Sequence, residues 1–328
     1  REVTAQIGGT EVARASIIRP RERWRAVAPV RLSIPIPPSP APTEVVLRSA
    51  TSTPDEVLDN GDTRRLGVPV LDARLGRGPS LFPWISLVTA SDSVSGWIDT
   101  YDSIVAISAF TAEWIARLWG RSSLVVEPPV TMRTPGPKEP IIVSVGRFFS
   151  EDRGHSKKQL EMVRAFRRLG PVADGWTLHL VGGCAPADAD YLAKVRAEAD
   201  GLDVVFHVDA SGAELDELYS RASIYWHATG LDDDLSVRPE RAEHFGITTV
   251  EAMSAGAVPI VHDAGGQPEI VRDGVDGYVF ADADTLIERT RSLLADDARR
   301  DLLAASAIER ARRYSTERFA DRFCVLVD

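Results

Sequence analysis

Residues 238–253 read RPERAEHFGITTVEAM, and residues 254–261 continue with SAGAVPIV. Two carboxylates, Glu243 and Glu251, stand in this stretch with seven residues between them. Apolar residues recur around Glu251 at helical spacing, which predicts a helix that begins near Phe245. Gly256 is suited to end that helix, and the apolar run after it predicts a strand at 258–261.

This arrangement would gather a loop carboxylate, a helix N-terminus and a second carboxylate in one small volume. The first N–H groups of a helix carry partial positive charge and suit a phosphate. A nearby carboxylate can accept hydrogen bonds from both hydroxyls of a ribose. The stretch therefore indicates a site for a nucleoside diphosphate. The plainer alternative is an amphipathic helix that carries two glutamates on its surface.

The same stretch resembles the E-x7-E signature of retaining nucleotide-sugar glycosyltransferases of family four, which have the GT-B fold. Residues 265–271, GGQPEIV, and residues 274–278, GVDGY, are similar to the next block of that family. The resemblance implies that Glu243 contacts the donor sugar, with a nucleophilic role left open, and that Glu251 holds the ribose. It also implies that the helix start binds the donor and that a glycine backbone lines the sugar pocket. The residues concerned are Phe245, Gly246 and Ile247 at the helix start, and Gly265 and Gly266 at the pocket.

From residue 136 to residue 310, strands and helices alternate cleanly. Short apolar runs typical of buried strands are separated by segments with helical periodicity. Such alternation predicts a parallel sheet with helices on both faces, which is the Rossmann-like α/β arrangement. The expected strands are 141–145, 177–181, 204–207, 224–227, 258–261 and 278–280, and the expected helices are 157–169, 187–199, 213–221 and 245–255.

A glycine and two cations follow the first of these strands. Gly146 would let the backbone approach a ligand closely, and Arg147 with Lys157 could neutralise a diphosphate. This resembles the G-R…K pair of the family, in which both cations hold the donor phosphates. We therefore place Arg147 and Lys157 with Glu243 in the catalytic group, and Gly146 among the donor-binding residues. Lys158 stands next in sequence, so naming Lys157 is a choice of register, and a solvated helix start is the alternative.

Two further polar features near strand ends are given structural roles. His227 ends a strand just before the glutamate stretch and is expected to be a core histidine. The run Asp232, Asp233, Asp234 could suggest a D-x-D metal motif, but no apolar strand flanks it. Because two cations already supply positive charge, we expect a solvated loop here. We also expect no metal and no cofactor beyond the nucleotide sugar, which is a substrate.

Residues 1–80 are expected to form a β-sandwich-like module, because short apolar runs alternate there with Gly and Pro punctuation. Residues 60–68, NGDTRRLGV, resemble a phrase found in sugar-binding β-modules of bacterial glycosyltransferases. A spacer without a ligand is the alternative. Residues 81–135 are similar to the last strand-helix-strand unit of the family's N-terminal, acceptor-side domain. Residues 136–310 would form the nucleotide-sugar-binding domain, and residues 311–328 resemble its C-terminal crossing helix.

The earlier units of the N-terminal domain are not evident in the sequence, and the chain begins at Arg1. We therefore expect Arg1 to lie inside a longer parent chain, whose N-terminal domain is interrupted by the β-module. The rival interpretation is a short enzyme that is complete.

The net charge of the 328 residues is −10, which argues against nucleic acid as the main partner. Cys184 and Cys324 lie far apart in sequence and are expected to be free thiols in a reducing compartment. No stretch of the sequence is long and apolar enough to span a bilayer. We expect a cytoplasmic protein, and peripheral contact with the inner face of a membrane is left open.

These patterns and the resemblance together predict a retaining glycosyltransferase of the GT-B type. It would have a Rossmann-like donor domain, a partial N-terminal α/β domain and a small β-sandwich-like region. It would move a hexose, with mannose as one option, from a nucleotide-diphosphate sugar to a glycan or lipid-linked acceptor, as in polysaccharide biosynthesis. The alternatives are a glycan-binding protein with a vestigial donor domain and a GT-B sugar epimerase.

Overall fold

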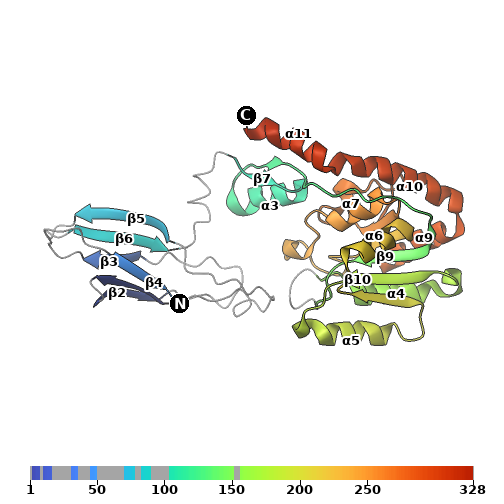
Figure 1. Cartoon of the computed structure of the whole chain (residues 1–328), viewed down its shortest axis with the longest axis horizontal. Coiled ribbons are helices and arrows are strands. Elements are labelled where there is room, and N and C mark those ends of the chain that lie inside the picture. The colour runs from blue at the N-terminus through green and yellow to red at the C-terminus, as the bar shows by residue number, and fades with distance from the viewer. Residues whose placement is uncertain are drawn as a thin grey trace. The chain divides into compact units, whose positions relative to one another are not determined.

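The computed structural model describes residues 2–7, 10–16, 31–35, 45–49, 70–77, 83–89, 103–150 and 156–327. The chain divides into two compact units, Arg1–Ser103 and Ile104–Asp328, and each is described by itself. Figure 1 shows the strands of the first unit and the mixed helices and strands of the second.

The first unit contains two antiparallel sheets of three strands each. One has the order β2 (Thr10–Ser16), β1 (Glu2–Ile7), β4 (Val45–Ser49), and the other has the order β3 (Arg31–Pro35), β6 (Pro83–Thr89), β5 (Val70–Arg77). Because β6 pairs with both β3 and β5, the boundary expected at residue 80 falls between paired strands. The β-structure predicted here is therefore present and extends further, while its closure into a sandwich stays a prediction. Residues 60–68 lie outside the described residues.

The second unit is built on a parallel sheet of six strands, which confirms the predicted doubly wound arrangement. Each strand lies at the place predicted from its apolar run. The order across the sheet is β11 (Val204–Val208), β10 (Thr177–Gly182), β9 (Glu139–Val145), β12 (Ala222–His227), β13 (Val258–His262) and β14 (Tyr278–Phe280).

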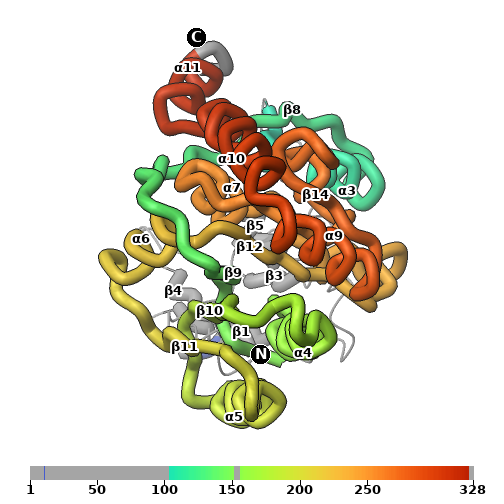
Figure 2. Tube along the Cα trace, turned by 90° about the vertical axis from the view of Figure 1, so that its right-hand side faces the viewer, coloured from blue at the N-terminus to red at the C-terminus, as the bar shows by residue number. Residues whose placement is uncertain are grey.

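Helices cover both faces of this sheet because the side chains of each strand alternate between the two faces. On one face Ile142, Leu180 and Trp226 pack against helices α4 (Gln159–Leu169), α5 (Ala189–Glu198) and α9 (Ala283–Ala295). On the other face Val143, Tyr225 and Val261 pack against α6 (Gly212–Arg221), α7 (Ile247–Ser254) and α10 (Asp297–Ala311). In Figure 2 helix α10 lies beside α7, with which it is in contact.

A strand-helix-strand unit precedes the large sheet, as the sequence predicted. Its parallel strands are β7 (Val105–Ala106) and β8 (Leu124–Val125), joined by α3 (Ala109–Trp119). The side chain of Glu269, in the short helix α8 (Gln267–Ile270), accepts hydrogen bonds of 2.7 Å from the first two backbone N–H groups of α3. This carboxylate therefore joins the strand-helix-strand unit to the large sheet.

The C-terminal segment returns to the chain that follows β8. The carbonyl of Tyr314, in the turn Arg312–Tyr314, accepts a 2.8 Å hydrogen bond from Val130 N–H. Helix α11 (Thr316–Val327) then carries Arg322 to Glu127. Both cysteines are free. In the part of the chain that the structure describes, no helix is long and apolar enough to cross a membrane.

Two stacked histidines on neighbouring strands make the fold sensitive to acid. Nδ1 of His179 on β10 lies 3.0 Å from Nε2 of His207 on β11. Burial, then the neighbouring His207, lowers the pKa of His179 to about 4. Burial also lowers the pKa of His207, although Glu214 opposes that shift. The fold therefore holds this pair in the neutral form.

We expect the free energy of unfolding to decrease as the pH falls from the ordinary histidine pKa of about 6.5 toward 4, because the unfolded chain binds protons first in that window. The variant His179→Gln keeps a hydrogen-bonding group but cannot be protonated. Between pH 7 and pH 5, the free energy of unfolding of this variant should fall by about 2 kcal/mol less than that of the parent. Urea unfolding followed by the helical circular dichroism signal measures this difference, and parallel pH curves for both chains would contradict it.

Candidate functional site

The candidate site lies where the parallel strands end, the edge at which doubly wound sheets bind ligands. Gly146 directly follows β9, and its packing leaves no room for a side chain: a Cβ there would lie 2.5 Å from Cγ of Lys157. A Cβ on Gly182, at the end of β10, would lie 2.0 Å from the carbonyl oxygen of Gly146. The two strand ends therefore touch through glycine backbone, which brings Lys157 against the end of β9.

Glu243 is the centre of a cluster of titratable side chains at this edge. Its Oε2 lies 2.5 Å from Nζ of Lys157 and 3.0 Å from Nε2 of His227, which ends β12. Burial opposes ionisation, but the hydrogen bond from His227 and the charge of Lys157 outweigh it and hold the pKa of the Glu243 carboxyl well below its usual range. Burial lowers the pKa of His227, so a neutral ring donates through Nε2–H to an ionised carboxylate.

The start of α7 is held against the loop after β13 by backbone contacts. Gly246, the N-cap of α7, has φ +117°, a conformation that side-chain-bearing residues rarely adopt. The N–H of Gly266 donates a 2.8 Å hydrogen bond to the carbonyl of Glu243. A Cβ on Gly265 would lie 2.1 Å from the same carbonyl oxygen. The predicted glycine pair therefore lies directly on the backbone of the predicted catalytic glutamate.

Two residues of the predicted helix start differ in what they can offer a ligand. The ring of Phe245 is buried and packs edge-on against Tyr314, with 5.5 Å between ring centroids. The side chain of Phe245 is therefore part of the core, and only its backbone could contact a donor. Ile247, the first residue of α7, is 48% exposed.

Glu251 lies on α7 and is almost fully buried by two partners. Its Oε1 forms an ion pair with the guanidinium of Arg133, which also pairs with Asp216. Its Oε2 accepts a 3.1 Å hydrogen bond from the hydroxyl of Tyr219. Burial raises the pKa of Tyr219 well above its usual value, so this phenol keeps its proton and acts as a donor.

Arg147 is exposed, and its guanidinium lies over the ring of Phe149 with 5.4 Å to the centroid. Its backbone carbonyl and that of Gly146 both accept 3.1 Å hydrogen bonds from the side-chain amide of Gln159. The segment that carries Arg147 is therefore fixed beside the start of α4, while the predicted contact of its side chain with phosphate stays a prediction.

The aspartate run is exposed at Asp232 and Asp234, as the sequence predicted, but its middle residue is not. The side chain of Asp233 is 7% exposed and lies 3.0 Å from Nζ of Lys158 and 2.7 Å from Nη1 of Arg241. Lys158 itself is buried, with φ +58° at the N-cap of α4. The two consecutive lysines thus have different partners, and it is Lys157 that reaches Glu243.

The structure therefore brings half of the predicted site residues together: Gly146, Lys157, Glu243, Gly265 and Gly266 touch one another directly or through a shared neighbour. Sequence reasoning placed His227 in the core, where it is, but missed its hydrogen bond to Glu243. It also missed Arg133 and Tyr219, whose contacts with Glu251 join residues distant in sequence.

Solved structures with the same arrangement define the fold class. HepE from Anabaena, in complex with UDP and glucose, matches with a TM-score of 0.58 and 17% identity, over 69% of this chain and 62% of its own. Sucrose-phosphate synthase from Thermosynechococcus elongatus matches with a TM-score of 0.56 and 22% identity, over 69% of this chain and 57% of its own. The chain therefore has a fold of the GT-B type, as predicted.

The family model of glycosyl transferases group 1 matches residues 133–313, more than half of the chain. The chain belongs to this family, which confirms the family seen in the glutamate stretch. The match includes Glu243 and Glu251 together with Gly146, Arg147 and Lys157.

Curated relatives are similar over part of their length. D-inositol 3-phosphate glycosyltransferase of Geodermatophilus obscurus is 35% identical over 251 residues, 67% of this chain and 51% of the relative. Sulfoquinovosyl transferase SQD2 of Arabidopsis thaliana is 26% identical over 183 residues, 54% of this chain and 31% of the relative. The mouse GDP-Man:Man(3)GlcNAc(2)-PP-Dol alpha-1,2-mannosyltransferase is 28% identical over 198 residues, 53% of this chain and 36% of the relative. The chain thus spans between about a third and a half of these relatives.

We predict that Asp233→Asn destabilises the fold, because the buried ammonium of Lys158 then loses its carboxylate. Removing one partner of a buried ion pair typically costs about 3 kcal/mol. The matched control is Asp232→Asn, since Asp232 is exposed and its replacement should change stability by less than about 0.5 kcal/mol. Urea unfolding measures both, and equal stability of the two variants would contradict the buried pair.

Proposed function

We propose that this protein transfers a hexose from a nucleotide-diphosphate sugar to a glycan or lipid-linked acceptor, with retention at the anomeric carbon. The observation that carries the proposal is the ionised Glu243 held by Lys157 and His227 beside the start of α7. The family membership of the chain supports the transfer of a glycosyl group from an activated donor.

The phosphates of the donor would be held by positive groups at the strand edge. Departure of a nucleoside diphosphate builds negative charge on its phosphates, and fixed donors lower the energy of that charge most when they are already in place. Two cations lie at this edge. Glu243 fixes Nζ of Lys157, and Arg147 follows Gly146 directly with an exposed side chain. The first N–H groups of α7 have no partner within the helix, and such groups bind anions.

Glu243 would change partners when the donor binds. A phosphate competes with Glu243 for Lys157, and a carboxylate released from Lys157 can accept a hydrogen bond from a sugar hydroxyl. His227 would continue to hold Glu243 after Lys157 is released, because its Nε2–H donates to Oε2 of the carboxylate. The backbone of Gly265 and Gly266, which packs against Glu243, would then form the wall next to the sugar.

Glu251 would hold the ribose as a carboxylate fixed in advance. Each of its oxygens accepts one bond in the fold, Oε1 from Arg133 and Oε2 from Tyr219. Since a carboxylate oxygen has two lone-pair directions, each keeps one for a ribose hydroxyl. Arg133 and Tyr219 would therefore position the carboxylate without occupying it, and no metal or further cofactor is proposed.

The test of this function is a donor screen followed by product analysis. Uridine and guanosine diphosphates are titrated calorimetrically to find the base, and sugars of that nucleotide are then offered with glycan and lipid-linked acceptors. HepE is in complex with UDP and glucose, and the mouse mannosyltransferase is named for GDP-Man, so sugars of UDP and GDP are the first donors to try. Nuclear magnetic resonance of the product reads the anomeric configuration, and an inverted product would overturn the retaining mechanism.

We predict that Lys157→Ala weakens binding of the preferred nucleoside diphosphate by roughly tenfold to a hundredfold, the usual range for a lost hydrogen bond to a charged group. Lys194→Ala is the matched control, because Lys194 is exposed on α5. Calorimetric titration of both variants measures the effect. Equal affinities for the two would remove Lys157 from the donor site.

A second prediction isolates the ribose contact. The parent should bind the ribonucleotide roughly tenfold more tightly than the 2′-deoxy nucleotide, because one hydroxyl contact with an ionised group is lost. In Glu251→Gln this preference should shrink toward unity, and in Glu217→Gln, on the exposed side of α6, it should persist. A preference that survives in Glu251→Gln would place the ribose elsewhere.

A further inference from the structure

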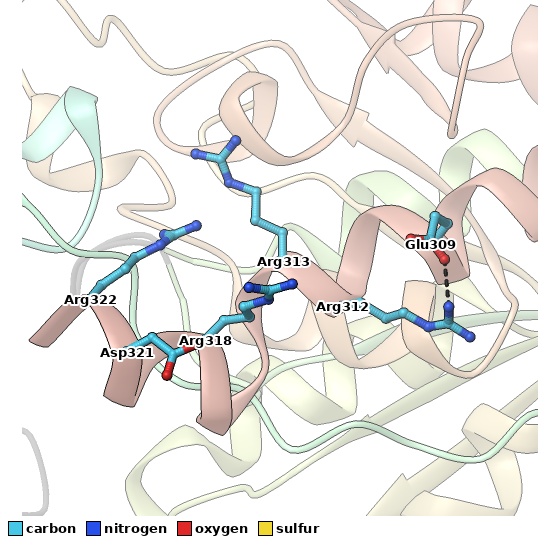
Figure 3. Close-up of a pocket in the computed structure, with 6 residues that line it drawn as sticks. All are labelled: Glu309, Arg312, Arg313, Arg318, Asp321 and Arg322. Atoms are coloured by element: carbon cyan, nitrogen blue, oxygen red, sulfur yellow. Dashed lines mark hydrogen bonds and ion pairs between the residues drawn. The ribbon is translucent and has the colours of Figure 1, made fainter.

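A pocket that shares no residue with the candidate site lies at the junction of α10 and α11. It has a volume of about 610 Å³, within the range of small-molecule sites. Four arginines and two acidic residues line it (Figure 3), and they are Glu309, Arg312, Arg313, Arg318, Asp321 and Arg322. This basic concentration contrasts with the net charge of −10 of the whole chain.

The ion pairs in the fold leave positive charge unmatched in this pocket. Arg313 and Arg322 share the single carboxylate of Glu127, with 3.0 Å between Arg313 and that carboxylate. Arg312 pairs with Glu309 at 2.6 Å. Among the residues that the structure describes, no acid or other acceptor lies within bonding distance of the Arg318 guanidinium. The guanidinium of Arg318 is therefore available to a ligand, and those of Arg313 and Arg322 share the carboxylate of Glu127.

The remaining acid, Asp321, leaves an excess of one positive charge, since four arginines stand against Glu127, Glu309 and Asp321. It makes no ion pair within the described part of the chain, and in Figure 3 its carboxylate points away from the guanidinium groups of Arg313 and Arg322. Phe323, on the next turn of α11, is 41% exposed and stacks on Phe319 with 5.4 Å between centroids. Helix α11 thus carries an exposed aromatic side chain as well as Arg318 and Arg322 of the pocket.

We propose that the pocket at the α10–α11 junction binds a phosphoryl anion, with Arg318 as its main contact and Arg313 and Arg322 as its neighbours. Guanidinium groups are planar, always charged and able to make paired hydrogen bonds to phosphate oxygens, which is why clusters of arginine recognise this chemistry. The phosphoryl group is either a lipid headgroup or a soluble phosphate, and the two sources are separated by the experiment.

The test begins with Lys157→Ala, which removes the proposed phosphate contact in the donor site. Inorganic phosphate is titrated into this variant by calorimetry, and vesicles of phosphatidylglycerol and phosphatidylcholine are cosedimented with it. We expect at least one of these probes to bind, and adding Arg318→Gln to weaken that binding roughly tenfold, as for a lost charge-assisted hydrogen bond. Binding should also weaken as salt is raised.

The matched control adds Arg168→Gln instead, because Arg168 is an exposed arginine on α4 with one surface ion pair. Loss of vesicle binding alone identifies a lipid headgroup, and loss of phosphate binding alone identifies a soluble anion. If neither probe binds, or if the Arg318→Gln chain binds as well as the Arg168→Gln chain, the pocket is not a phosphoryl site. Because both chains carry Lys157→Ala, phosphate bound by the remaining donor-site groups contributes equally to both, and the difference between them reports on the pocket at the α10–α11 junction.

Discussion

The side chain of Glu243 is only 19% exposed. A carboxylate withdrawn from solvent to this extent has to be matched by fixed donors, since an unpaired charge in the interior is strongly destabilising. The fold provides these donors from two separate places, Lys157 before α4 and His227 at the end of β12. The segment between β12 and α7 is thereby tied to the sheet edge close to the start of α7. Since α7 begins four residues after Glu243, with Gly246 as its N-cap, the same tie fixes where that helix starts.

The glycines complete this arrangement, because they let backbone segments meet where side chains would keep them apart. The carbonyl of Glu243 accepts the N–H of Gly266 and lies where a Cβ of Gly265 would be. Gly146 and Gly182 do the same at the ends of β9 and β10. Backbone N–H groups and charged side chains are therefore concentrated in one region, which is the composition that a phosphorylated ligand requires. The identity of the ligand then depends on side chains such as Glu251 and its partners.

Local patterns in the sequence predicted the strands of the large sheet well. The features that they did not predict depend on ion pairs between residues distant in sequence. Apolar runs located each strand of the large sheet, because buried parallel strands are apolar on both faces. Helices α9 and α10 were not predicted, although Asp282 and Asp296 cap them. Asp233 was expected in solvent because a run of acids is usually exposed, whereas Lys158 and Arg241 bury it. Nothing near Glu251 in sequence indicates Arg133, which reaches it only in the folded chain.

The linker between β8 and β9 shows how such pairs connect distant parts of the unit. At one end Glu127 is shared by Arg313 and Arg322, so the carboxylate joins the linker to the C-terminal helix. A few residues later Arg133 joins the same linker to α6 through Asp216 and to α7 through Glu251. Since the core contact of Val130 lies between these two points, the linker is held by charge at both ends and by burial in the middle. The orientation of the Glu251 carboxylate therefore depends on a segment outside the large sheet, and a replacement of Arg133 should weaken the proposed contact of Glu251 with ribose while leaving the strands and their helices in place.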